Sequence, residues 1–142
     1  MEYKVNFVVG EAQSRPGYIE LNATHIADLN QTLDDGECTE IIALDVLDFL
    51  PLAQRGNFLN HLVQKLEIGA AVKVGGREIN AVAHAIGSGQ IYEETANACI
   101  YQGRQSMTNA VKTRDLMKFI GLEITAVYND GFNYVVEARR VV

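Results

Sequence analysis

Residues that mark metal sites and disulfide frameworks are scarce in this chain of 142 residues. It has two cysteines, three histidines, two prolines and no tryptophan. Cys38 and Cys99 lie far apart, and neither a CxxC pair nor the spacing of zinc ligands surrounds them. We therefore expect two core thiols and no metal site.

Positive charge and long apolar runs are also in short supply. Lys and Arg number 12 against 18 Asp and Glu, a net charge of −6, whereas general binding of a nucleic acid backbone needs a basic face. The apolar run at Phe7–Val9 is too short for the core of a signal peptide, and no stretch approaches the ~20 residues that span a bilayer. We expect a cytoplasmic protein with no membrane partner and no general nucleic-acid binding.

Composition favours one globular domain over residues 1–142, since 48% of the residues are apolar and 21% are charged. Alternating apolar residues predict an opening strand over Tyr3–Val9 that stops at Gly10. The apolar run Glu40–Leu44 is typical of a strand buried on both faces of a parallel sheet. Further short strands are expected at residues 18–21, 26–29 and 70–74, with turns at 34–36 and 75–76.

Helical spacing is clearest between Leu52 and Leu66, where Pro51 suits the first turn and Gly69 is the expected C-cap. Three more helices are expected over residues 79–86, 92–101 and 113–120, and two final strands, 122–128 and 133–139, read as a hairpin. This order predicts an α/β fold with a mainly parallel sheet that ends in an antiparallel hairpin.

The sequence also predicts how deeply two sets of side chains are buried. Near-complete burial is expected for Ile41, Ile42, Leu44, Leu62 and Val72. Buried rings with exposed hydroxyls are expected for Tyr92, Tyr101, Tyr128 and Tyr134.

The order of elements and several strings resemble the class I S-adenosylmethionine-dependent methyltransferases. The closest likeness is to small bacterial and phage members that open with K-L-N-L-G-C-G, four variable residues, then P-G-Y and an acidic residue. Here Lys4–Gly10 is followed by four residues and then by Arg15–Asn22. Ala27–Leu29 resembles the family's A-D-L, Glu40–Pro51 its D-E-I-x-A-x-H-V-L-E-H, and Leu66–Ala70 its L-K-P-G-G.

The resemblance implies a Rossmann-like methyltransferase fold and S-adenosylmethionine as the cofactor. In open α/β sheets ligands lie at the carboxyl ends of the strands. The residues that would face the cofactor are Val8, Gly10, Asn22, Asp28 and Asp45. Arg104, in an expected exposed loop over Gly103–Asn109, and Tyr101 near that loop are candidate substrate-binding residues. No catalytic residue is identified, because methyl transfer needs little beyond alignment of the methyl group with a nucleophile.

Three departures from the family pattern weaken the predicted cofactor site. Val8 stands where the family has its first glycine, which lets the backbone approach the cofactor. Asn22 replaces an acidic residue that accepts both ribose hydroxyls, and it offers one acceptor oxygen instead of two. The connection from Gly10 to Pro16 is too short for the helix whose N-terminus usually faces the cofactor's carboxylate.

Two functions of different classes therefore stay open. One is a methyltransferase-like protein whose cofactor binding is weakened or lost. The other is a non-enzymatic binding or assembly module, for example a viral structural one, that uses the fold as a scaffold within an oligomer or a larger assembly. Asp45 also has two interpretations, a carboxylate facing the ligand or the N-cap of the next helix, and Asp48 is interpreted as helix N-terminal charge.

Overall fold

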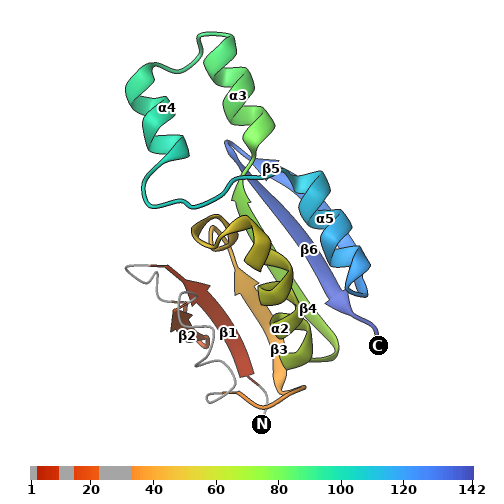
Figure 1. The fold of residues 1–142 in the computed structure, drawn as a ribbon. Helices are drawn as coiled ribbons and strands as arrows, with labels where there is room; N and C mark the ends of the chain where they lie inside the picture. The colour runs from red at the N-terminus through yellow and green to blue at the C-terminus, as the bar shows by residue number, and fades with distance from the viewer. Residues whose placement is uncertain (1–2, 10–14, 23–32) are drawn as a thin grey trace.

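Six strands form one sheet in the part of the chain that the structure, a computed structural model, describes: residues 3–9, 15–22 and 33–142 (Figure 1). The strands are β1 (Tyr3–Val8), β2 (Ile19–Asn22), β3 (Cys38–Ala43), β4 (Leu66–Arg77), β5 (Leu122–Asp130) and β6 (Asn133–Arg140). Their order across the sheet is β2-β1-β3-β4-β6-β5. The first four are parallel, whereas β6 runs antiparallel to both β4 and β5. The predicted sheet with its antiparallel hairpin is confirmed. The short strand expected at residues 26–29 lies outside the described residues.

Helices cover one face of the sheet and also extend beyond one end of it (Figure 1). The covering helices are α2 (Arg55–Lys65), preceded by the 3-10 turns η2 (Leu47–Phe49) and η3 (Leu52–Gln54), and α5 (Ala110–Phe119). The pair α3 (Ile79–Gly87) and α4 (Glu93–Ile100) projects past the end of β4, and we call it the arm. Residues 101–109, here the return segment, lead from the arm back to α5.

Side-chain caps set where the later helices begin. The side chain of Asn109 accepts a hydrogen bond from the N–H of Lys112 (2.8 Å), so α5 starts at Ala110, earlier than apolar spacing predicts. One carboxylate oxygen of Glu78 accepts from the N–H of Asn80 in α3 (2.9 Å), and the other accepts from the N–H of Ala110 in α5 (3.0 Å). The Glu78 side chain thereby joins the start of α3 to the start of α5 at the base of the arm.

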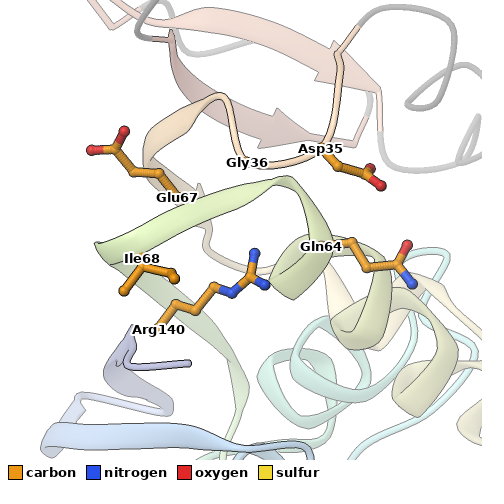
Figure 2. A pocket seen from close by; sticks show the side chains of 6 residues that line it. All are labelled: Asp35, Gly36, Gln64, Glu67, Ile68 and Arg140. Atoms are coloured by element: carbon orange, nitrogen blue, oxygen red, sulfur yellow. The ribbon is translucent and has the colours of Figure 1, made fainter.

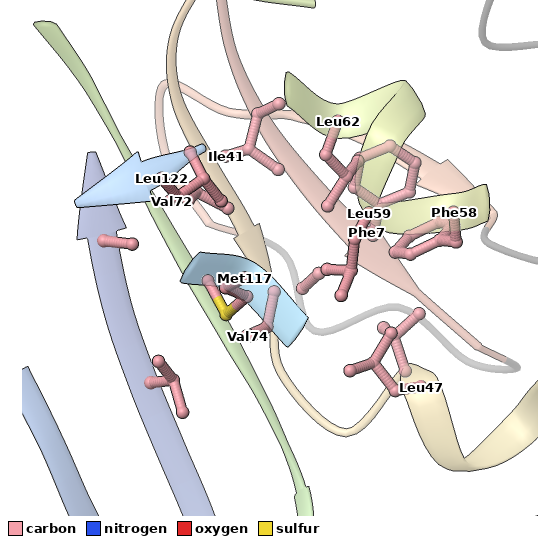
Figure 3. Packing of buried hydrophobic residues seen from close by; sticks show 14 of the residues in the cluster. Phe7, Ile41, Leu47, Phe58, Leu59, Leu62, Val72, Val74, Met117 and Leu122 are labelled. Atoms are coloured by element: carbon pink, nitrogen blue, oxygen red, sulfur yellow. The ribbon is translucent and has the colours of Figure 1, made fainter. Parts of the chain in front are cut away.

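The main core lies between α2, α5 and one face of the sheet. Figure 3 shows Leu59 and Leu62 of α2 directed toward the strands, with Met117 of α5 beside them. The rings of Phe7 in β1 and Phe58 in α2 meet edge to face, with centroids 5.4 Å apart. None of the arm's buried residues belongs to this cluster. The arm is therefore held by its base and the return segment, and not by the main core.

Four of the five predicted core residues are almost fully buried, namely Ile41, Ile42, Leu62 and Val72. Successive strand residues point to opposite faces, so burial of both Ile41 and Ile42 means that β3 is covered on both sides at this point. The prediction for Leu44 is wrong. β3 ends at Ala43, and Leu44 is half-buried in the turn that follows.

Three glycines of β4 were predicted to mark its boundaries, and that prediction is wrong because the strand begins at Leu66 and runs through all of them. Gly69 has φ +90°, a left-handed conformation that side chains with a Cβ rarely adopt. A Cβ on Gly75 would lie 2.5 Å from the carbonyl oxygen of Tyr134, and one on Gly76 would lie 2.6 Å from a carboxylate oxygen of Asp48. Gly75 and Gly76 therefore allow β4 to pass close to β6 and to Asp48.

The tyrosines differ from their predicted environment. Tyr134 is fully buried together with its hydroxyl, which accepts a hydrogen bond from the Thr113 hydroxyl (2.9 Å). Tyr92 and Tyr101 have exposed rings, at 85% and 64% of their surface, because the arm has no neighbour in the described residues that covers them. Tyr128 is 45% exposed, since it lies on the edge strand β5.

Truncation of Ile42 tests the burial of β3. We expect Ile42→Ala to lower the free energy of unfolding by about 2–5 kcal/mol, because it removes buried methyl groups and leaves a cavity. The matched control is Ile68→Ala in β4, where the side chain is 69% exposed. Urea denaturation measures both variants, and a loss below about 1 kcal/mol for Ile42→Ala would contradict the placement of β3 inside the sheet.

The two cysteines test the separate stability of the arm. Both are buried free thiols, and burial, followed by the nearby charge of Glu37, raises the pKa of Cys38 to about 11. We expect Cys99, in α4, to react with an aromatic disulfide reagent at least about tenfold faster than Cys38, because the arm opens without unfolding the main core. Reaction rates of Cys38→Ala and Cys99→Ala assign each thiol, and equal rates would show that the arm unfolds only with the rest of the molecule.

Candidate functional site

A crevice of about 420 Å³ lies at the carboxyl ends of β1 and β3. Its walls comprise Asn6, Phe7, Val8, Val9, Arg15, Leu44, Asp45, Phe49 and Asn133. A smaller hollow of about 100 Å³, toward β4 and β6, shares Leu44, Asp45 and Asn133 with it. The position is the one where open α/β sheets take their ligands, since the chain turns away from the sheet there.

Two of the predicted cofactor residues lie side by side at this edge. Val8 and Asn22 are paired in register at the carboxyl ends of β1 and β2. Val8 and Asp45 line the crevice, while Asn22 lies at the exposed end of β2. Gly10 and Asp28 lie outside the described residues. The roles of all five residues stay predictions.

Asp45 occupies a turn directly after β3. Its φ of 56° is left-handed, and its N–H donates to the carbonyl of Gly75 (3.1 Å). Its carboxylate receives two hydrogen bonds from the Arg104 guanidinium, at 2.6 and 3.0 Å. The N-cap of η2 is Val46, so the interpretation of Asp45 as a helix cap is wrong. The side chain is 45% exposed and faces the crevice while bound to Arg104.

Asp48 is the centre of a buried charge network. Its side chain is fully buried, with one carboxylate oxygen bound by Arg55 (3.1 Å) and the other by Arg104 (2.7 Å) and by the N–H of Arg77 (2.9 Å). Its backbone carbonyl accepts from the N–H groups of Gln105 (2.7 Å) and Ser106 (3.0 Å). The sequence interpretation of Asp48 as helix N-terminal charge missed these contacts, because its partners come from β4, α2 and the return segment.

The network fastens the return segment to residues 45–55. The hydroxyl of Ser106 accepts from Nε and Nη2 of Arg55 (3.1 and 2.8 Å) and donates to the carbonyl of Leu50 (2.8 Å). The side-chain amide of Gln105 donates to the carbonyl of Phe49 (3.0 Å). The prediction that residues 103–109 form an exposed loop is wrong, since most of them are half-buried along this seam.

Arg104 is buried in this seam, with a side chain only 3% exposed. Its guanidinium lies 5.0 Å from the ring centroid of Phe49. Burial lowers the pKa of Arg104, but hydrogen bonds and charge from Asp45 and Asp48 outweigh that effect and raise it above the ordinary value. Neither Arg104 nor the exposed Tyr101 lines the crevice. Their predicted contact with a substrate stays a prediction.

The histidines and clusters of possible metal ligands are the other candidate sites. His84 is exposed and His61 half-buried, and no group of three or more His, Cys, Asp or Glu in the described residues could hold a metal ion. No helix within the described ranges combines the length and apolar character needed to cross a membrane.

A second hollow, of about 490 Å³, lies at the opposite end of the sheet (Figure 2). It is lined by Asp35, Gly36, Gln64, Glu67, Ile68 and Arg140. The Arg140 guanidinium donates to the carbonyls of Val63 (3.0 Å) and Leu66 (2.6 Å), where α2 ends. None of the predicted site residues lines this hollow, which we interpret as a structural feature of the α2–β4 junction.

Removal of the Asp48 charge tests the network. We expect Asp48→Asn to lower the free energy of unfolding by about 3–5 kcal/mol, because it leaves buried arginines without a full counter-charge. The matched control is Asp115→Asn. The Asp115 carboxylate is 59% exposed on α5 and pairs with Arg114, so we expect its removal to change the stability little. Thermal and urea unfolding measure both, and equal stabilities of the two variants would contradict the central role of Asp48.

Comparison with known proteins rests on structure alone. The chain matches no protein-family model and no curated protein. Among solved structures, a SAM-dependent methyltransferase from Archaeoglobus fulgidus gives a TM-score of 0.62 at 10% identity, over 87% of this chain and 67% of that one. An O-methyltransferase family protein from Burkholderia thailandensis gives 0.60 at 11%, over 87% and 35%. Magnesium protoporphyrin IX methyltransferase from Synechocystis PCC 6803, with bound SAH, gives 0.56 at 14%, over 89% and 52%.

This chain therefore spans between 35% and 67% of the length of the three proteins. The identities are low, but the superpositions cover most of this chain and agree with its sheet and its reversed last strand. The chain has the Rossmann-like α/β fold of the class I S-adenosylmethionine-dependent methyltransferases.

Proposed function

We propose that this chain binds S-adenosylmethionine in the crevice at the ends of β1 and β3, as a methyltransferase-like protein with weakened cofactor affinity. The observation that carries the proposal is the pairing of Val8 with Asn22 beside this crevice. The resemblance in sequence assigns these two positions to the glycine turn and to the ribose. The fold brings both to one edge, next to Asp45.

The residues of the crevice fit such a ligand in chemical type. Leu44 and Phe49, both half-buried, supply apolar surface for a flat aromatic base, while Asn6 and Asn133 contribute polar groups to the same wall. The amide of Asn22 accepts from one ribose hydroxyl and donates to the other. When bound, the cofactor supplies an activated methyl group, and the protein's part is to hold it in line with an acceptor.

Two features of the same edge account for the weakened affinity. The side chain of Val8 narrows the approach at the end of β1, where a glycine would let the backbone contact the ligand. In the connection from β1 to β2, the described residues 15–18 contain no helix, so they offer no helix N-terminus to a carboxylate. Among the described residues, the crevice walls and Asn22 are then left to hold the ligand.

A second candidate is a non-enzymatic binding or assembly module, and the arm favours it. Ile79, Ile86, Tyr92 and Tyr101 are between 40% and 85% exposed on or beside this projecting pair of helices. Exposed apolar and aromatic side chains on a projecting element are typical of surfaces that contact another protein. In this alternative the crevice has no cofactor and the fold acts as a scaffold.

Isothermal titration with S-adenosylmethionine separates the two candidates. We expect measurable wild-type binding in the micromolar range, tightened roughly 5–30-fold in the double variant Val8→Gly/Asn22→Asp, since charge-assisted hydrogen bonds to the ribose contribute about 1–2 kcal/mol. The matched control makes the same two changes on the edge strand β5, Val127→Gly/Asn129→Asp, and should leave the affinity unchanged.

The outcomes point in different directions. Binding that arises only in the double variant at the crevice would favour the scaffold, because the wild-type chain would then have lost its cofactor. No binding in any variant would refute this placement of the pocket. Equal tightening by the control variant would show that Val8 and Asn22 do not contact the ligand.

A further inference from the structure

The tip of the arm is exposed and acidic. Residues 88–94 join α3 to α4 at the end of the arm that lies farthest from the sheet (Figure 1). Tyr92 is 85% exposed there, and the two residues that follow it, Glu93 and Glu94, are exposed as well. Residues 78–103 contain three glutamates and no lysine or arginine. The tip therefore presents an aromatic ring beside two negative charges.

The outer face of α5 has the complementary character. Val111 and Phe119 are exposed apolar residues on this face, and Lys112 and Lys118 lie exposed next to them. The whole helix holds three basic residues and one acidic residue, which gives it a net charge of +2. An apolar surface with an excess of positive charge suits a partner that is apolar and negative.

A small hollow of about 140 Å³ adjoins this face, between η3 and α5. Leu47, Leu52 and Leu116 form its apolar wall, and the exposed Lys112 also lines it. Sites for small molecules usually measure about 300–1,000 Å³, so this hollow is too small for a cofactor and suits a single side chain. Thr108 lines it too, and its hydroxyl can pair with a phenolic hydroxyl.

The charges at both places lack partners within one copy of the chain. Neither the carboxylates of Glu93 and Glu94 nor the ammonium groups of Lys112 and Lys118 form an ion pair with any described residue. The nine-residue helix α3, about 13 Å long, carries the tip away from the base of the arm, where α5 begins. The tip and the outer face of α5 can therefore meet only between two copies.

We propose that this chain assembles with itself through the tip of the arm, which docks on α5 of a second copy. The ring of Tyr92 fills the hollow, and the carboxylates of Glu93 and Glu94 face the two exposed lysines of α5. Each copy offers one tip and one hollow, so the contacts close into a reciprocal pair or a ring. This inference gives the arm of the second candidate function its partner, and it does not depend on cofactor binding.

Sedimentation of the folded full chain measures the assembly, since one copy has a mass of 15.6 kDa. We expect the wild type to form a species of two or more copies at micromolar concentration, and to dissociate as salt is added, because the ion pairs lie at the surface. Tyr92→Ser should raise the dissociation constant at least about tenfold, since it removes the side chain that fills the hollow. The matched control, Tyr128→Ser on β5, should leave it unchanged.

Charge reversal identifies the two surfaces. Glu93→Lys/Glu94→Lys, and in a separate chain Lys112→Glu/Lys118→Glu, should each stay monomeric, because like charges then face each other. An equimolar mixture of the two variants should assemble again, since every contact between unlike copies joins opposite charges. Assembly of the mixture is a result that a merely structural role of these four residues would not produce.

The control for charge reversal is Glu123→Lys/Asp130→Lys on β5, which should assemble like the wild type. Circular dichroism shows that each variant is folded, and if a reversal variant fails to fold, Tyr92→Ser still decides the outcome. A wild type that stays monomeric at millimolar concentration would overturn the inference, as would assembly that the tip and α5 variants leave unchanged. Titration with S-adenosylmethionine tests the crevice separately, so failure of either proposal leaves the other standing.

Discussion

The buried carboxylate of Asp48 is the group that holds together the end of the molecule where the crevice and the base of the arm lie. A charge withdrawn from water is costly unless its partners are close and its hydrogen bonds are complete. Here two arginines, one strand N–H and two N–H groups on its own carbonyl meet that requirement. They come from β4, α2 and the return segment, so the position of one side chain fixes three separate parts of the chain.

The same contact links the arm to the crevice. The arm contributes nothing to the main core, and its return segment is held instead through Gln105, Ser106 and Arg104. Arg104 continues the link to Asp45, which faces the crevice. Residues 104–106 are thus in contact, through Asp45 and Asp48, with the edge of the sheet where the crevice lies.

Periodicity in the sequence predicted much of the fold but little of this network. Apolar spacing identifies the helix that became α2, the buried strand at Ile41 and Ile42, and the closing hairpin, because each pattern reflects burial of neighbouring residues along the chain. It misplaced the boundaries of β4, since only the approach of Tyr134 and Asp48 explains Gly75 and Gly76. The sequence predicted Arg104 in an exposed loop. No local pattern indicates that Arg104 pairs with two distant aspartates.

The place of β6 has a consequence for the order of folding. β6 follows both of its neighbours in the chain but lies between them in the sheet. During synthesis β4 therefore has an open edge, and β5 has no strand to pair with, until the ribosome has released β6. Completion of the sheet is thus a late event, and ribosome pausing in this region would prolong the exposure of both strands to chaperones.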